Sequence, residues 1–170
     1  DAVVANYRML TGNSPMMPLY LFGYIQSKER YVSSDDLINT LKEYRQRQIP
    51  IDMIVQDWNY WPEGQWGNMS MNPKFYPDKR KLADEIHSLH AKLMISIWPN
   101  AMNCPQHEEF KRKGWLLSGT SVYDAFNPLA RKLYWNYANN EFFGNGFDAW
   151  WCDASEPLDA DWTLDRKSVV

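Results

Sequence analysis

The sequence has little of several features that define common classes of protein. Only two of its 170 residues are cysteines, Cys104 and Cys152, and their spacing matches neither a zinc ligand set nor a disulfide framework. No apolar run reaches the roughly 18 residues that a membrane-spanning helix needs. Basic residues gather at 111–113, which we interpret as a solvated helix end, and the formal net charge is −3. We therefore expect neither a nucleic-acid partner nor a membrane segment.

Two further absences concern cofactors. No glycine-rich phosphate loop follows the first apolar run, because residues 26–29 read Gln-Ser-Lys-Glu, and this disfavours a nucleotide-binding fold. The three histidines, His87, His90 and His107, do not combine with the acids into a metal-ligand spacing, and we interpret them as surface residues. The sequence thus predicts no metal and no other cofactor.

Aromatic residues, in contrast, are abundant. Nine Trp, ten Tyr and seven Phe make up 15% of the chain, although the mean hydropathy is only −0.58. Aromatic faces exposed in a polar background suit stacking on sugar rings, whose C–H faces are apolar. A core that simply uses large residues explains the same composition, so composition alone leaves both interpretations open.

Apolar runs alternate with helical patterns along the whole chain. Predicted strands cover residues 19–25, 51–55, 92–98 and 147–152, and predicted helices open at Ser33, Asp78 and Asn127. Such alternation predicts an α/β fold with parallel strands and right-handed crossovers. Both an open doubly wound sheet and part of a (β/α)₈ barrel fit the pattern, and a complete barrel typically needs about 250 residues.

Acidic and indole side chains follow the predicted strands. Asp57 comes after the second strand, Trp98 ends the third, and Asp153 and Glu156 follow the fourth. In barrel enzymes the carboxyl ends of the strands form the active site. Carboxylates and indoles at one mouth suit carbohydrate chemistry, in which an acid attacks an oxocarbenium-like centre.

Each of these residues also has a purely structural interpretation. Asp57 and Asp153 are suited to cap the helices that follow them, and Glu156 to a solvated loop. The tryptophans that a barrel core would also accept are Trp98, Trp150 and Trp151. For Trp150 we favour packing, because alternate strand positions face the helices.

Five segments in order resemble glycoside hydrolase family 31, and within it the α-xylosidase-like branch. They are PLYLFGYIQSKERY (18–31), IPIDMIVQDWNYW (49–61), MISIWP (94–99), YDAFNPLARKLYW (123–135) and GFDAWWCDASEP (146–157). The resemblance implies the N-terminal half, about strands one to four, of a (β/α)₈ TIM barrel. It also implies a retaining double displacement that acts on an oligosaccharide substrate.

The resemblance further assigns roles to individual positions. Asp153 matches the catalytic nucleophile, Glu156 a supporting acid, Asp57 a ligand for hydroxyls of the terminal sugar, and Trp151 a wall of the pocket. Cys152 departs from the methionine expected in the family, without changing this assignment.

A preference for α-linked xylose over glucose is implied at one position. Xylose lacks the exocyclic hydroxymethyl group of glucose, and the bulky Trp98 is suited to fill that space. Shape discrimination in an apolar pocket is typically worth only about 1–3 kcal/mol. An α-glucosidase or transglycosidase of the same family therefore stays open.

The general acid that a retaining glycosidase needs is not found in the sequence. We therefore expect residues 1–164 to be a partial catalytic barrel domain that is inactive by itself. Residues 165–170 (DRKSVV) do not resemble the family and match the translation of a common sequencing adapter, so we expect a non-native tail. A carbohydrate-binding barrel without catalysis is the alternative. An aldolase or isomerase barrel is disfavoured, because no strand-end lysine or phosphate site is visible.

Overall fold

The fold is a parallel sheet covered by helices, seen in a computed structural model that describes residues 1–155. The strands are β1 (Ile25–Gln26), β2 (Met53–Gln56), β3 (Lys92–Ile97) and β4 (Ala149–Cys152). All neighbours pair in parallel, and the order is β1-β2-β3-β4. Because the order follows the sequence without reversal, it is the order of a barrel, whereas a doubly wound sheet reverses at a switch point.

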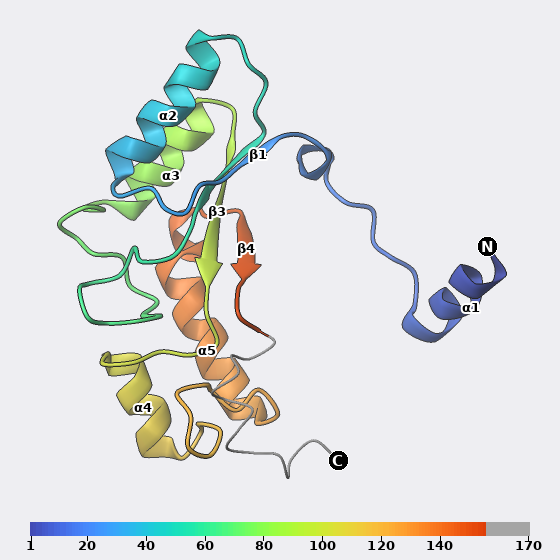
Figure 1. Cartoon of the computed structure of the whole chain (residues 1–170), viewed down its shortest axis with the longest axis vertical. Helices are drawn as coiled ribbons and strands as arrows, with labels where there is room; N and C mark the ends of the chain where they lie inside the picture. Colours follow the sequence, from blue (N-terminus) through green and yellow to red (C-terminus); the bar gives the residue numbers. More distant parts are fainter. Residues whose placement is uncertain (156–170) are drawn as a thin grey trace.

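Five α-helices and two 3₁₀ helices connect or precede these strands. They are α1 (Ala2–Thr11), η1 (Leu19–Phe22), α2 (Ser34–Gln46), α3 (Lys79–Ser88), α4 (Pro105–Lys113), α5 (Pro128–Glu141) and η2 (Phe143–Asn145). Helices α2, α3 and α5 lie along one side of the sheet, whereas α1 lies apart from the rest (Figure 1).

The three predicted helix starts are confirmed, each with a side-chain cap. The Ser33 hydroxyl accepts from the amide of Asp36 at the start of α2, and the Asp78 carboxylate accepts from Lys81 at the start of α3. Asn127 caps α5 in the same way. Each cap satisfies an amide that the first helical turn leaves without an acceptor.

The predicted first strand is wrong over most of its length. Residues 19–22 form η1, and Leu19 and Phe22 are exposed. Only Ile25–Gln26 pairs with β2. Directly before it, the amide of Tyr24 donates to the Asp52 carboxylate, and this carboxylate lies where a Cβ on residue 23 would be. The apolar run of residues 19–25 is therefore helical at its start, and only its last residue belongs to a strand.

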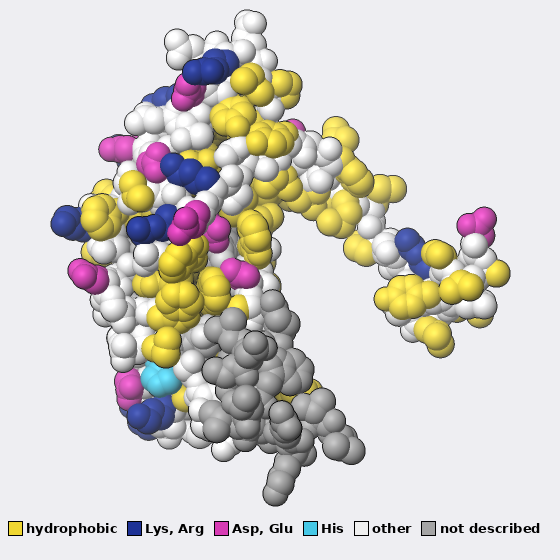
Figure 2. Space-filling model, in the orientation of Figure 1, with side chains coloured by type: hydrophobic (Ala, Val, Ile, Leu, Met, Phe, Trp, Pro, Cys, Tyr) yellow, Lys and Arg dark blue, Asp and Glu magenta, His cyan; other side chains and the backbone are white. Residues whose placement is uncertain are grey.

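The first 22 residues carry an apolar surface that the sequence analysis did not anticipate. Helix α1 has no buried residue, and apolar side chains cover it and the segment that joins it to the sheet (Figure 2). Helix α4 was also not predicted beyond its basic end. Within residues 1–155, no helix is both long and apolar enough to cross a membrane.

The core lies between the sheet and its helices. Ile54, Leu93, Ile95 and Ile97 project from the strands and are at most 3% exposed, and they belong to the same apolar cluster as helix side chains. Their helix partners include Leu37, Leu41, Leu82 and Ile86. Because successive strand residues alternate between faces, this cluster identifies the face of β2 and β3 that the helices cover.

The start of β4 is tied to β3 by one carboxylate. Asp148 accepts from the Lys92 ammonium at 2.9 Å and from the Leu93 amide at 2.9 Å, and lies 2.7 Å from the His87 ring nitrogen. Burial opposes ionisation, but these donors outweigh it and lower the pKa of Asp148. His87 is 34% exposed, so it lies at the surface as expected, but its ring nitrogen also contacts Asp148 in this network.

Arg45 makes a similar tie at the start of β2. Its guanidinium donates to the carbonyls of Leu89, Ile51 and His90 at 2.7, 2.8 and 2.9 Å. One side chain of α2 thus holds both the start of β2 and the turn between α3 and β3.

Replacing Arg45 by Met should lower the free energy of unfolding by about 2–3 kcal/mol, because charge-assisted bonds to three carbonyls are lost. Arg47→Met is the matched control, since Arg47 pairs only with exposed Glu43 on its own helix and should change stability by less than about 0.5 kcal/mol. Urea unfolding of both variants measures the difference. Equal losses would show that Arg45 holds nothing beyond its own helix.

Candidate active site

Three candidate site residues follow directly after neighbouring strands. Asp57 comes after β2, Trp98 after β3 and Asp153 after β4. The strands are parallel, with Gln56 opposite Ile95 and Ile97 opposite Cys152. The three residues therefore lie at the same edge of the sheet.

Alternation places the acids on the face that the helices leave free. Ile54 and Trp150 pack toward the helices. Asp57 lies three positions beyond Ile54 along the chain, and Asp153 lies three positions beyond Trp150. An odd offset along a strand reverses the face. Trp151, 42% exposed, is also one step from Trp150 and shares the open face with the acids.

Asp57 does not cap a helix. Its carboxylate accepts from the amide of the next residue, Trp58, at 2.7 Å, and the next helix begins only at Lys79 with its own cap, Asp78. Burial raises the pKa of Asp57, and the charges of Asp153 and Glu29 raise it further. The two predicted acids are therefore close enough to repel one another.

Asp153 stands on a constrained turn. Its amide donates to the carbonyl of Ile97 at 3.0 Å, which extends the pairing with β3 by one residue. Its carboxylate accepts from the amide of Ala154 at 2.9 Å. Ala154 is buried and has a φ of 48°, a left-handed conformation that costs a residue with a Cβ free energy and that often marks functional sites.

Tryptophans line the loop beside Asp57. Trp66 contacts Trp58, Trp61 and Trp98, with ring centroids 5.6, 5.4 and 5.1 Å apart. Trp61 is 4% exposed and belongs to the core, whereas the others are partly buried. The core interpretation of the aromatic content therefore holds for Trp61, and stacking on sugar rings stays a prediction for the partly buried tryptophans.

Trp150 packs as expected. Its ring meets Trp135 and Phe142 of the helical layer, with centroids 5.8 and 6.2 Å apart. This confirms the packing interpretation for Trp150.

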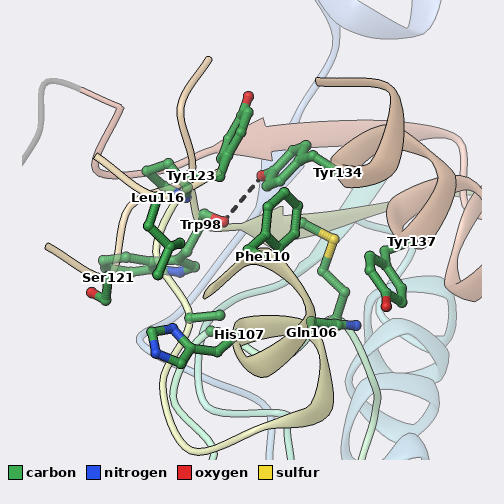
Figure 3. A pocket seen from close by; sticks show the side chains of 13 residues that line it. Trp98, Gln106, His107, Phe110, Leu116, Ser121, Tyr123, Tyr134 and Tyr137 are labelled. Carbon is green, nitrogen blue, oxygen red and sulfur yellow. Dashed lines mark hydrogen bonds between the residues drawn. The ribbon is translucent and has the colours of Figure 1, made fainter. Parts of the chain in front are cut away.

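Behind Trp98 lies a cavity of about 20 Å³. Its lining comes from the end of β3, from α4, from α5 and from the loops around residues 67 and 121 (Figure 3). Within it, the Tyr134 hydroxyl donates to the carbonyl of Trp98 at 3.1 Å. Neither Asp57 nor Asp153 lines this cavity.

Sequence reasoning missed Glu29, which follows β1. Its charge acts on Asp57, so an acid stands after β1 as well as after β2 and β4. The predicted strand ended only one residue before β1 does, so its end was not the obstacle. That Glu29 acts on Asp57 depends on the pairing of β1 with β2, which no local pattern gives. Glu156 lies outside the described residues, and so do the expected boundary at 164 and the tail 165–170.

Among the residues that the structure describes, no group of three or more His, Cys, Asp or Glu is arranged to hold a metal ion.

A family model described as the glycosyl hydrolases family 31 TIM-barrel domain matches residues 14–169. The chain belongs to this family. The predicted family and the predicted fold class, the N-terminal part of a TIM barrel, are thereby confirmed.

Individual relatives agree with this. An α-xylosidase of Saccharolobus solfataricus is 40% identical over 158 residues, covering 92% of this chain and 22% of the relative. A family 31 glucosidase of Pseudescherichia vulneris, itself uncharacterised, is 29% identical, covering 91% and 32%. The solved α-xylosidase of Xanthomonas citri is 39% identical with a TM-score of 0.83, covering 91% and 18%. The chain thus spans about a fifth to a third of the length of these relatives.

The charge on Asp57 should reduce the stability of the chain. Because its pKa in the folded chain lies above the usual 3.8, the unfolded chain ionises more readily and stability falls as the pH rises through both values. Asp57→Asn should therefore raise Tm at pH 7. The gain in the free energy of unfolding should stay below about 1 kcal/mol, because the carboxyl keeps some hydration. The gain should shrink below pH 3.8.

Thermal unfolding at several pH values tests this. Asp84→Asn is the control, since exposed Asp84 pairs with Arg80 and its neutralisation should bring no gain at pH 7. A gain for Asp57→Asn that is the same at pH 3 and pH 7 would mean that charge is not the cause.

Proposed function

We propose that the chain is part of the catalytic barrel of a retaining α-glycosidase that releases non-reducing terminal α-linked xylose from oligosaccharides. The observation that carries the proposal is the position of Asp153, after β4 and beside Asp57 on the open face of the sheet. The family and its α-xylosidase members support it. In this proposal Asp153 is the nucleophile.

The reaction would proceed in two displacements. A carboxylate oxygen of Asp153 attacks the anomeric carbon, the bond from that carbon to the leaving oxygen breaks, and a general acid protonates that oxygen. Water, deprotonated by the same group, then hydrolyses the glycosyl ester and releases the sugar with its original anomeric configuration. The turn at Ala154 and the pairing of the Asp153 amide with β3 fix the nucleophile for this attack.

The remaining side chains would bind the sugar. Asp57 accepts hydrogen bonds from hydroxyls of the terminal residue, Trp151 offers an exposed indole face, and Glu156 supports the site. Burial makes such bonds to a carboxylate stronger than in water. No cofactor takes part in this scheme.

Trp98 would select for xylose. Its ring is fixed against Trp66, with centroids 5.1 Å apart, so it would not move aside for a hydroxymethyl group without breaking that contact. Because a family 31 glucosidase is also among the relatives, hydrolysis of, or transfer from, α-glucosides by the same site is the second candidate.

The 170-residue chain alone should not hydrolyse an aryl α-xyloside or an aryl α-glucoside. Attack by Asp153 stalls without a general acid, and we assign that acid to a later part of the barrel. Release of the chromogenic aglycone by purified chain and by its Asp153→Ala variant tests this. Turnover by the chain that disappears in Asp153→Ala would show that the chain is active without the later part of the barrel.

In the longer protein, Trp98→Ala should narrow the preference for α-xylosides. Loss of the indole makes room for a hydroxymethyl group and loosens the binding of xylose. The ratio of kcat/KM for the xyloside to kcat/KM for the glucoside should therefore fall roughly ten- to a hundredfold, which corresponds to a loss of about 1–3 kcal/mol of discrimination. Asp153→Ala should abolish both activities.

Trp135→Ala is the control for this ratio. Trp135 packs on the helical side against Trp150, so its loss should lower stability and leave the ratio of the two substrates unchanged. An unchanged ratio in Trp98→Ala would place the selectivity in other residues.

A further inference from the structure

Two ring nitrogens near the end of β3 are buried without a hydrogen-bond partner among the described residues. They are Nε1 of Trp98 and Nδ1 of His107, a residue in the first turn of α4. Buried polar groups almost always have a partner in the protein or in ordered water. Both side chains line the cavity behind Trp98 (Figure 3).

The cavity has the size and the chemistry for one water molecule. Its volume is about 20 Å³, and a water needs roughly 10–15 Å³ on this scale. The indole N–H of Trp98 only donates, whereas an imidazole nitrogen without a proton accepts. A single water therefore satisfies both, accepting from Trp98 and donating to His107.

The ring face and the backbone carbonyl of Trp98 already have contacts. Its ring meets Trp66, and its carbonyl accepts from the Tyr134 hydroxyl at 3.1 Å. The orientation of the indole about its long axis then depends on what its nitrogen binds. His107 belongs to α4 and not to the sheet, so the indole would be held by contacts from two different parts of the fold.

We propose that His107 is a positioning residue that holds the Trp98 indole through one buried water molecule and thereby sharpens the choice between xylose and glucose. The water site rests on the cavity and on the two unpartnered ring nitrogens, whereas the effect on selectivity rests on the function proposed above. His107 does not touch the substrate in this scheme.

The water site is tested on the 170-residue chain by NMR. The indole N–H signal of Trp98, identified by its loss in Trp98→Phe, should show a nuclear Overhauser peak of the sign given by a long-lived water. His107→Leu should abolish the peak. His107→Asn should retain it, because the amide oxygen of Asn lies near the place of Nδ1. A missing peak in the original chain, or a peak unchanged in His107→Leu, would overturn the site.

The positioning role is tested in the longer protein by kinetics. His107→Leu should lower the xyloside-to-glucoside ratio of kcat/KM by roughly three- to tenfold, with the change mainly in KM for the xyloside, and His107→Asn should restore it. A ratio that stays unchanged in His107→Leu would overturn the positioning role.

The two failures are distinguishable. If the longer protein hydrolyses neither substrate, the proposed function fails, and the NMR result still decides the water site. If the longer protein hydrolyses both substrates and His107→Leu leaves the xyloside-to-glucoside ratio of kcat/KM unchanged, the proposed function is retained and the positioning role of His107 is wrong.

Discussion

Every feature of the candidate site depends on the parallel register of β2, β3 and β4. Parallel pairing brings the carboxyl ends of all strands to one edge, and the pairing of Ile97 with Cys152 sets Trp98 and Asp153 side by side. A shift of one residue in this register would turn the acids toward the helices, because side chains alternate between the faces of a strand. The register is therefore a condition for the chemistry as well as for the core.

The two ends of the sheet have different tasks. At the amino ends of the strands, Arg45 and Asp148 are surrounded by partners of complementary character, and these contacts favour the folded chain. At the carboxyl ends, Asp57 and Asp153 repel each other, and Ala154 has a left-handed backbone. Barrel enzymes commonly separate stability and activity between these two ends, and the charges of individual residues in this chain follow the same division.

The tryptophans divide along the same line. Trp150 and Trp135 pack between the sheet and α5, where they fill the core. Trp66 and Trp98 meet at the mouth, beside the acids. Under the proposed function, contacts among these rings would matter for recognition even where no ring touches the sugar itself, because stacking on a sugar requires a ring held in place.

The sequence by itself determined the family, the order of strands and helices after residue 26 except for α4, three helix caps, and the acids after β2 and β4. These follow from local patterns: periodicity, capping residues and motifs that need no knowledge of distant contacts. The tertiary structure alone decided that 19–22 is not a strand, that His87 binds Asp148, and that Glu29 acts on Asp57. The physical reason is that each depends on a partner far along the chain, which no local pattern encodes.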